Sequence, residues 1–230
     1  MQSVAFFDID GTVFRSSLLI ELVDALVREG IFPDEARDVY RDALTAWRNR
    51  EGTYEEYIAA VIAAFLEHIQ GVHYSALSDI GKRIVAIQSK RVYRYTRDLI
   101  AELKDEGYYI VAISQSPKLL LDAFCTQYGF DKVYGRMYEI GPQDRFTGVT
   151  SDEHLIENKA NIVKRVFEHN PDLTPRGSLA VGDTEGDIPL LESVEHPICF
   201  NPNQALYKYA TQMGWEVVVE RKDVIYHIGE

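Results

Sequence analysis

Two carboxylates stand two positions apart near the start of the chain, directly after an apolar run. Asp8 and Asp10 follow Ser3–Phe7, whose composition is typical of a strand buried on both faces of a parallel sheet, and Gly11 and Thr12 come next. Open α/β sheets bind ligands at the carboxyl ends of their strands, so we expect both acids at such an end. Burying two carboxylates together is costly, which favours a bound cation. An Asp-Gly turn would explain Asp10 and Gly11 but not Asp8.

Two later apolar runs also end in polar residues. Tyr108–Ile113 is followed by Ser114, and Gly177–Val181 is followed by Asp183 and Asp187. Right-handed crossovers bring the carboxyl ends of parallel strands to one edge of the sheet. The four carboxylates would repel one another there unless a hard divalent cation lay among them. Ligation by oxygen alone suits Mg²⁺, which is the cofactor we predict.

Two residues could bind an anion beside this cation. Ser114 lies at a junction between a strand and a helix, where hydroxyl and backbone N–H groups can hold a phosphate, and Lys159 lies in a predicted helix. Taken singly, a serine helix cap and a solvated lysine are the commoner interpretations. Together with the acids, these residues predict a phosphate site with a carboxylate ready to attack the phosphorus.

Composition and charge limit the possible partners. The 230 residues include 24 basic and 36 acidic side chains, a formal net charge of −12, which argues against binding of nucleic acid. The longest apolar run, Tyr57–Leu66, is about half the length of a membrane helix, so we expect no membrane contact. Cys125 and Cys199 lie far apart and match no disulfide or zinc pattern. We therefore expect a cytoplasmic protein with two buried, reduced cysteines.

The elements that must position these residues form an α/β chain with an insertion. We predict a Rossmann-like parallel sheet core from residues 1–15 and 95–230, and an all-helical cap from residues 16–94. Within the cap, helical spacing predicts a helix capped by Ser16 or Ser17, one opened by Pro33, one over Tyr57–Ile69 and one over Tyr74–Gln88.

The remainder of the core is predicted in the same way. Helices are expected over Tyr95–Glu106, after Pro117, around Lys159, after Pro189 and over Gln204–Gly214, and further strands over Pro197–Phe200 and Glu216–Glu220. Val133–Thr150 alternates around a Gly-Pro pair and predicts a β-hairpin, which could contact either the cap or a second subunit.

The four polar segments, in this order and after these strands, resemble the motifs of the haloacid dehalogenase-like superfamily of Mg²⁺-dependent phosphatases. They are DIDGT at residues 8–12, Ser114, Lys159, and GDTEGD at residues 182–187. The sequences ISQSP at residues 113–117 and GDTEGDIPLL at residues 182–191 are similar to those of the phosphoserine-phosphatase-like branch, subfamily IB. The helical insertion resembles that family's type-I cap.

The resemblance implies a role for each residue. Asp8 would be the nucleophile that forms an aspartyl-phosphate, and Asp10 the general acid and then the general base. Mg²⁺ would be held by Asp8, the backbone carbonyl of Asp10, Asp183 and Asp187. The residues expected to hold substrate phosphate are Ser114, Gln115, Lys159, Gly11 and Thr12, with Thr12 also orienting Asp10.

The chain departs from phosphoserine phosphatases at one position. Those enzymes carry a substrate-reading glutamate nine residues after the nucleophile, where this chain has Ser17; the nearest acid, Glu21, lies one helical turn on. The amino group of phosphoserine then has no obvious partner. We expect ordinary surface or core roles for the cap residues Arg48, Arg50, Tyr54 and Tyr57.

These observations predict a Mg²⁺-dependent phosphomonoester hydrolase that acts on a small phosphorylated metabolite, as a monomer or homodimer. A phosphotransferase or mutase of the same superfamily is the alternative, since an aspartyl-phosphate can also pass to an alcohol. A phospholigand-binding protein with a silent site is less favoured, because binding alone needs no paired nucleophile and acid, and both Asp8 and Asp10 are present.

Overall fold

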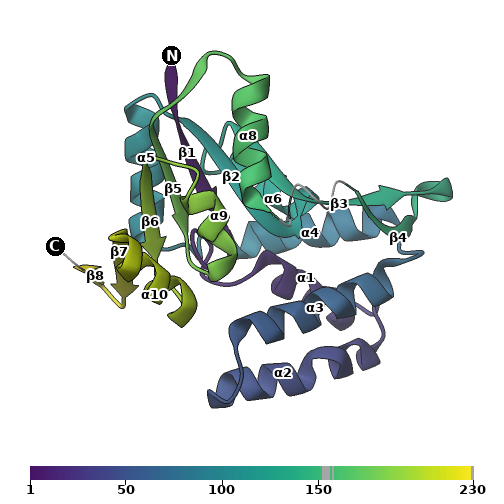
Figure 1. Cartoon of the computed structure of the whole chain (residues 1–230). Coiled ribbons are helices and arrows are strands. Elements are labelled where there is room, and N and C mark those ends of the chain that lie inside the picture. The colour runs from purple at the N-terminus through teal and green to yellow at the C-terminus, as the bar shows by residue number, and fades with distance from the viewer. Residues whose placement is uncertain (152–155, 157, 229–230) are drawn as a thin grey trace.

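The computed structural model describes residues 1–151, 156 and 158–228, and its centre is one eight-stranded sheet (Figure 1). The strand order is β4-β3-β2-β1-β5-β6-β7-β8. The six inner strands run parallel, while β4 and β8 at the two edges are antiparallel to their neighbours. The strands are β1 Gln2–Asp8, β2 Tyr109–Pro117, β3 Lys132–Ile140, β4 Phe146–Ser151, β5 Leu173–Gly182, β6 His196–Phe200, β7 Glu216–Arg221 and β8 Val224–Ile228. The predicted Rossmann-like α/β fold class is confirmed.

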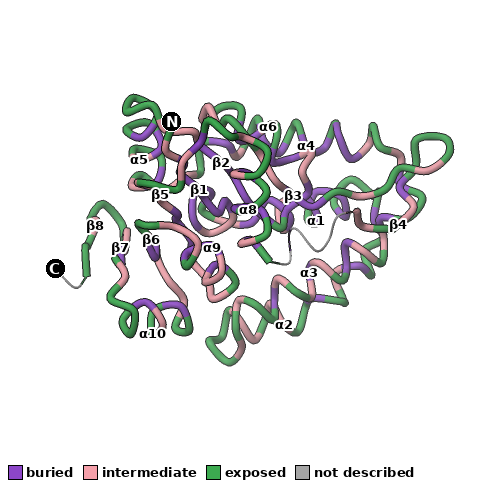
Figure 2. The backbone as a smooth tube through the Cα atoms, turned by 45° about the horizontal axis from the view of Figure 1, so that its top comes forward, coloured by how far each residue is buried: buried purple, intermediate pink, exposed green. Residues whose placement is uncertain are grey.

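The first strand lies in the middle of the sheet and is buried on both faces. Ala5 and Phe7 join one apolar cluster, and Val4 and Phe6 join the other. Figure 2 shows the buried backbone concentrated in the central strands. This two-sided burial explains the unbroken apolar run before Asp8, because neither face of β1 meets water.

Helices cover both faces of the sheet. On the face of Phe7 lie α5 (Arg94–Asp105) and α6 (Lys118–Thr126). On the face of Phe6 lie α8 (Lys159–His169), α9 (Ile188–Leu191) and α10 (Gln204–Met213) (Figure 1). Helices on both faces cover the parallel strands from water and leave the strand ends accessible to ligands.

The chain between β1 and α5 is helical. Its elements are α1 Leu18–Arg28, the 3₁₀ helix η1 Asp34–Arg37, α2 Asp38–Asn49, α3 Tyr54–Ile69 and α4 Tyr74–Gln88. The predicted capping box is present: Thr53 N donates to Glu56 Oε2 at 2.8 Å, and Glu56 N donates to Thr53 Oγ1 at 3.1 Å. The helix therefore begins at Tyr54, one turn before the predicted start at Tyr57.

The predicted hairpin is formed by β3 and β4, and it contacts the inserted helices. Gly71 N donates to Phe146 O at 2.8 Å, and Phe146 N donates to Val72 O at 3.0 Å. The rings of Phe65 and Tyr138 meet edge to face at 5.1 Å between centroids. The junction between α3 and α4 is thus fixed to an extension of the core sheet.

Some features differ from the predictions. Strand β8 was not predicted, because Val224, Tyr226 and Ile228 are 42–50% exposed and give no buried alternation. The strand β2 continues through Pro117, where it pairs with Arg136 of β3. Both cysteines are free and buried, as expected. Within the described ranges, no helix is long and apolar enough to cross a membrane.

Candidate active site

The predicted polar residues meet at the carboxyl ends of the three central strands. Asp8 ends β1 and pairs in register with Ile113 of β2, so Ser114 follows at the same level. Phe7 pairs with Val181 of β5, which brings Gly182 and then Asp183 to the same edge. Residues far apart in the chain therefore lie together because of strand register.

Three carboxylates gather closely enough to share one cation. Ligand oxygens of Asp8, Asp183 and Asp187 all lie within 4.8 Å of one another, and Asp8 and Asp187 are buried. A buried set of carboxylate oxygens is the donor chemistry of Mg²⁺. The Asp10 carboxylate is not among these three, and only its backbone carbonyl was expected to bind metal.

Lys159 lies between two of these acids. Its Nζ is 2.5 Å from Asp8 Oδ1 and 2.5 Å from Asp187 Oδ1, and the side chain is buried. Asn158 caps α8 by accepting a hydrogen bond from Ala160 N at 3.0 Å, which makes Lys159 the first residue of the helix. Burial disfavours the charge, but Asp187 and Asp8 raise the pKa of Lys159 above its usual value. Lys159 is thus a buried cation, not a solvated one.

The Asp10 carboxylate points toward the start of α1. It accepts a hydrogen bond from Leu18 N at 2.6 Å and another from the Ser114 hydroxyl. Ser17, at the N-cap position, makes no side-chain capping bond, and the Asp10 carboxylate, two residues beyond β1, caps the helix in its place. Burial raises the pKa of Asp10, while the bonds from Ser114 and Leu18 oppose this rise. A carboxyl group with a raised pKa is suited to carrying a proton.

Thr12 contacts a different acid from the one predicted. Its hydroxyl donates to Asp183 Oδ1 at 3.0 Å, so it orients Asp183, and the expectation that it orients Asp10 is wrong. Gly11 has φ +89°, and a Cβ there would lie 2.2 Å from Asp183 Oδ2. Only glycine fits between the turn and this carboxylate.

Asp187 is held by the turn that precedes it. Its Oδ2 accepts hydrogen bonds from Asp183 N at 3.0 Å and Thr184 N at 3.1 Å, and its other oxygen faces Lys159. A Cβ on Gly182 would lie 2.5 Å from Asp187 Cβ. The spacing of the GDTEGD segment is therefore required for this turn to close over the site.

The site contains more acidic side chains than basic ones. Burial raises the pKa of Asp8 to about 8, against the lowering effect of Lys159, and burial together with Asp8 and Asp187 also raises the pKa of Asp183. Each shift reports the cost of keeping a negative charge there without a sufficient counter-charge. A divalent cation between Asp8, Asp183 and Asp187 would remove this cost.

The inserted helices reach the site through the start of α3. Burial and the negative charges of Asp10, Asp183 and Asp8 raise the pKa of Tyr54, the first residue of this helix. The next residue, Glu55, shares a hydrogen bond with Glu185, and this bond raises the pKa of Glu55. The Tyr54 ring packs between Trp47 and Tyr57 against the apolar core, which agrees with the expected core role.

The other residues considered for substrate binding do not belong to the cluster of acids around Lys159. Gln115 is exposed, and its Oε1 lies 3.5 Å from Nη2 of Arg136, a buried arginine of β3 that sequence reasoning missed. Glu21 pairs with Arg91 at 2.9 Å, which occupies its carboxylate. Arg48 and Arg50 are exposed.

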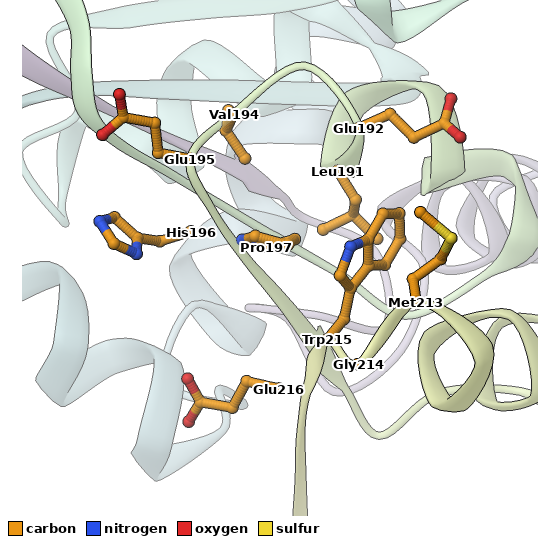
Figure 3. A pocket seen from close by; sticks show the side chains of 10 residues that line it. All are labelled: Leu191, Glu192, Val194, Glu195, His196, Pro197, Met213, Gly214, Trp215 and Glu216. Carbon is orange, nitrogen blue, oxygen red and sulfur yellow. The ribbon is translucent and has the colours of Figure 1, made fainter.

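A separate pocket lies away from these residues (Figure 3). It measures about 590 Å³ and lies at the starts of β6 and β7, which is the edge of the sheet opposite the acids. Its acids already have partners: Glu195 accepts from Gly177 N at 2.7 Å, and Glu216 lies 3.1 Å from His227. None of the predicted site residues lines this pocket.

Comparison with known proteins agrees with the geometry. A family model described as "haloacid dehalogenase-like hydrolase" matches residues 5–192, which include every acid of the site. The chain belongs to the haloacid dehalogenase-like hydrolase family. The recognition of this family from its motifs is confirmed, and with it the expectation of an enzyme of the phosphatase type.

Relatives in this family carry phosphatase names. A histidinol-phosphatase of Neisseria meningitidis serogroup C is 23% identical over 95% of this chain and 99% of its own. A phosphoserine phosphatase of Mycobacterium tuberculosis is 25% identical over 94% of this chain and 70% of its own. A solved phosphoserine phosphatase, in a phospho-aspartyl intermediate analogue form, has 17% identity and a TM-score of 0.64, covering 96% of this chain and 95% of its own. This structural likeness shows the shared fold.

Proposed function

We propose that the protein hydrolyses a small phosphate monoester in a Mg²⁺-dependent reaction through a phosphorylated Asp8. The observation that carries this proposal is the pair of differently oriented acids at the end of β1. Asp8 is held by Lys159, whereas Asp10 is held by Leu18 N and Ser114. This difference in surroundings supports the assignment of Asp8 as the nucleophile and Asp10 as the proton donor.

Each step uses a group of this chain. A carboxylate oxygen of Asp8 attacks phosphorus while Asp10 gives its proton to the departing alkoxide. Asp10 then takes a proton from the water that attacks the phosphorus of the phosphorylated Asp8 and releases inorganic phosphate. Lys159 stabilises the charge on the phosphoryl oxygens, and Ser114, Gln115 and the backbone around Gly11 and Thr12 complete the phosphate site.

The metal would be held by the acids that already lie together. Asp8, Asp183 and the backbone carbonyl of Asp10 are the proposed ligands, with Asp187 as a further ligand or a support. Mg²⁺ supplies charge neutralisation for the phosphate and its transition state. The excess of buried carboxylates over Lys159 supports this assignment.

We propose that residues 16–94 act as a cap on the core formed by residues 1–15 and 95–230. The contact of Glu55 with Glu185 supports this assignment, because it joins α3 to the loop that carries Asp183 and Asp187. A cap that opens admits substrate, and one that closes excludes water from the phosphorylated acid.

We further propose a cytoplasmic monomer or homodimer. Its two buried free cysteines support a reducing compartment. Cell fractionation and light scattering of the purified protein test these two points.

The test is release of inorganic phosphate from p-nitrophenyl phosphate by the purified protein, with Mg²⁺ and with EDTA. We expect turnover with Mg²⁺, loss with EDTA, and loss of at least about 10³-fold in Asp8→Asn, which removes the nucleophile. Asp105→Asn, an exposed substitution on α5, is the matched control and should retain activity. Beryllium fluoride should bind the wild type in the presence of Mg²⁺. Full turnover by Asp8→Asn would overturn the proposed mechanism.

A further inference from the structure

The first helix of the insertion, α1, is capped by side chains of the core. Leu18 N donates to Asp10 Oδ1 at 2.6 Å. Leu19 N, one residue further on, donates to Ser116 Oγ at 3.2 Å. The N–H groups at the start of a helix usually find an acceptor at the N-cap residue, but the side chain of Ser17 does not cap α1. The start of this helix is therefore held by one residue that follows β1 and one that lies near the end of β2.

Ser116 supports both of the groups that hold the Asp10 carboxylate. Its backbone N donates to Ser114 Oγ at 2.9 Å, and the Ser114 hydroxyl in turn donates to Asp10 Oδ2. Its own hydroxyl holds Leu19 N, next to the Leu18 N that donates to Asp10 Oδ1. Each carboxylate oxygen of Asp10 is thus bound by a group that Ser116 fixes, which closes a ring of hydrogen bonds between the core and α1.

This ring of hydrogen bonds is shielded from water. Ser116 and Leu19 are each 2% exposed, and Ser114 is 0% exposed. Burial raises the pKa of Asp10, and a side-chain hydrogen bond from Ser116 is among the contacts that oppose this rise. A buried N–H group that loses its acceptor is costly, because water cannot replace the missing bond. If Ser116 lost its hydroxyl, Leu19 N would have to move toward another acceptor, and the start of α1 would move with it.

We propose that Ser116 is a positioning residue that fixes the start of α1 and thereby keeps the Asp10 carboxylate in the orientation that protonates the departing alcohol. This inference rests on the proposed hydrolase function, in which Asp10 is the proton donor. Proton transfer needs the donor within hydrogen-bond reach, and a misplacement of about 1 Å can cost about 10²-fold in rate. A Ser116 variant should therefore lose the contribution of Asp10 to leaving-group departure, while Asp8 remains held by Lys159.

Ser178 offers a matched control for the loss of one buried hydroxyl. Its side chain is buried, and its Oγ accepts a hydrogen bond from Glu195 N at 3.2 Å, the same length as the bond from Leu19 N to Ser116. Glu195 directly precedes β6, at the edge of the sheet opposite the acids. Both serines thus accept one backbone N–H group, but only Ser116 is connected to Asp10.

Two aryl esters with different leaving groups test this role. p-Nitrophenolate departs readily without a proton, whereas phenolate depends more strongly on a proton donor. We expect Ser116→Ala to lower kcat/KM at least about tenfold for phenyl phosphate and less than about threefold for p-nitrophenyl phosphate. Asp10→Asn should show the same selectivity with larger losses, and Ser178→Ala should leave the ratio of the two values unchanged.

A stability measurement and a second variant separate positioning from general damage. Urea unfolding should show a comparable decrease in the free energy of unfolding for Ser116→Ala and Ser178→Ala, since each loses one buried hydrogen bond. Ser116→Cys keeps the size of the side chain but offers a weaker acceptor, and it should also lose phenyl phosphate hydrolysis selectively. This variant replaces Ser116→Ala if the latter does not fold.

The outcomes distinguish the role of Ser116 from the hydrolase function. Equal losses for the two esters in the Ser116 variant, or the same change of ratio in Ser178→Ala, would each overturn the positioning role with the hydrolase function intact. Equal losses in Asp10→Asn would overturn the assignment of Asp10 as proton donor and the role of Ser116 with it. Absence of Mg²⁺-dependent hydrolysis of both esters by the wild type would overturn the proposed function itself.

Discussion

Lys159 Nζ lies 2.5 Å from Asp8 Oδ1 inside the protein core, and the same nitrogen lies 2.5 Å from Asp187 Oδ1. All three side chains are buried. Breaking a buried ion pair leaves an uncompensated charge, which is much more costly than losing an exposed pair. In this arrangement the lysine orients the nucleophile and also offsets part of the repulsion among the acids.

We predict that Lys159→Met destabilises the metal-free protein by about 3–5 kcal/mol, because Asp8 and Asp187 lose their shared cation. It should also lower kcat at least about 10²-fold, since the phosphoryl charge loses a stabilising group. Urea unfolding in EDTA and steady-state kinetics measure the two effects. Lys164→Met, on the exposed side of the same helix, should change stability by less than about 0.5 kcal/mol. Comparable losses in both variants would contradict this account.

The stability of the metal-free protein should fall as pH rises. Burial raises the pKa of Asp8 from 3.8 to about 8, so the folded state binds a proton that the unfolded chain has lost within this range. The free energy of unfolding should therefore decrease between about pH 4 and pH 8. Thermal unfolding at several pH values in EDTA and in Mg²⁺ measures this. Mg²⁺ should reduce the decrease, and Asp8→Asn in EDTA should show a smaller one. A metal-free protein that gains stability across this range would refute the prediction.

Gly11→Ala should lower both stability and activity. The new methyl group would lie 2.2 Å from Asp183 Oδ2 at a backbone φ of +89°, so Asp183 must move. Gly30→Ala is the matched control: its φ is +71° and no atom lies within 4 Å of the added Cβ, so only backbone strain of about 1–2 kcal/mol remains. Chemical denaturation and phosphate release compare the two variants. We expect Gly30→Ala to keep full activity, and equal activity losses would refute a steric role for Gly11.

Thr53→Ala should destabilise the protein by about 1 kcal/mol, because the N-terminal end of α3 loses its capping bond to Glu56 N. Since the same bond fixes the start of α3, where Glu55 contacts Glu185, we also expect a higher KM with little change in kcat. Thr45→Ala, an exposed position within α2, should affect neither quantity measurably. An unchanged KM in Thr53→Ala would show that other contacts position the N-terminal end of α3.

The centre of the site could be predicted from sequence because each residue follows a buried strand. Asp8, Ser114 and Asp183 lie where the apolar pattern ends, and strand register brings them together. The predicted sheet, the helical insertion and the capping box all depend on local patterns of this kind.

The rest of the site depends on contacts that leave no local pattern. Glu55 meets the core through Glu185, which is 130 residues further along the chain. Arg136 is buried, between the buried Gly135 and the exposed Met137. Its burial follows from the pairing of β3 with β2, which no periodicity within β3 reveals.

The attachment of the hairpin β3–β4 to the inserted helices restricts how this insertion can move relative to the sheet. Backbone hydrogen bonds join the junction of α3 and α4 to Phe146. At the base of the insertion, where the chain leaves and re-enters the core, Tyr93 N donates to Val13 O at 3.0 Å and Arg15 N donates to Arg91 O at 2.8 Å. At the far end, Glu55 meets Glu185 through side chains. Backbone hydrogen bonds thus anchor the insertion at its base and at the α3–α4 junction, whereas the start of α3 meets the loop of Glu185 through a side chain. We therefore expect the start of α3 to be the part of the insertion that separates from the core most easily.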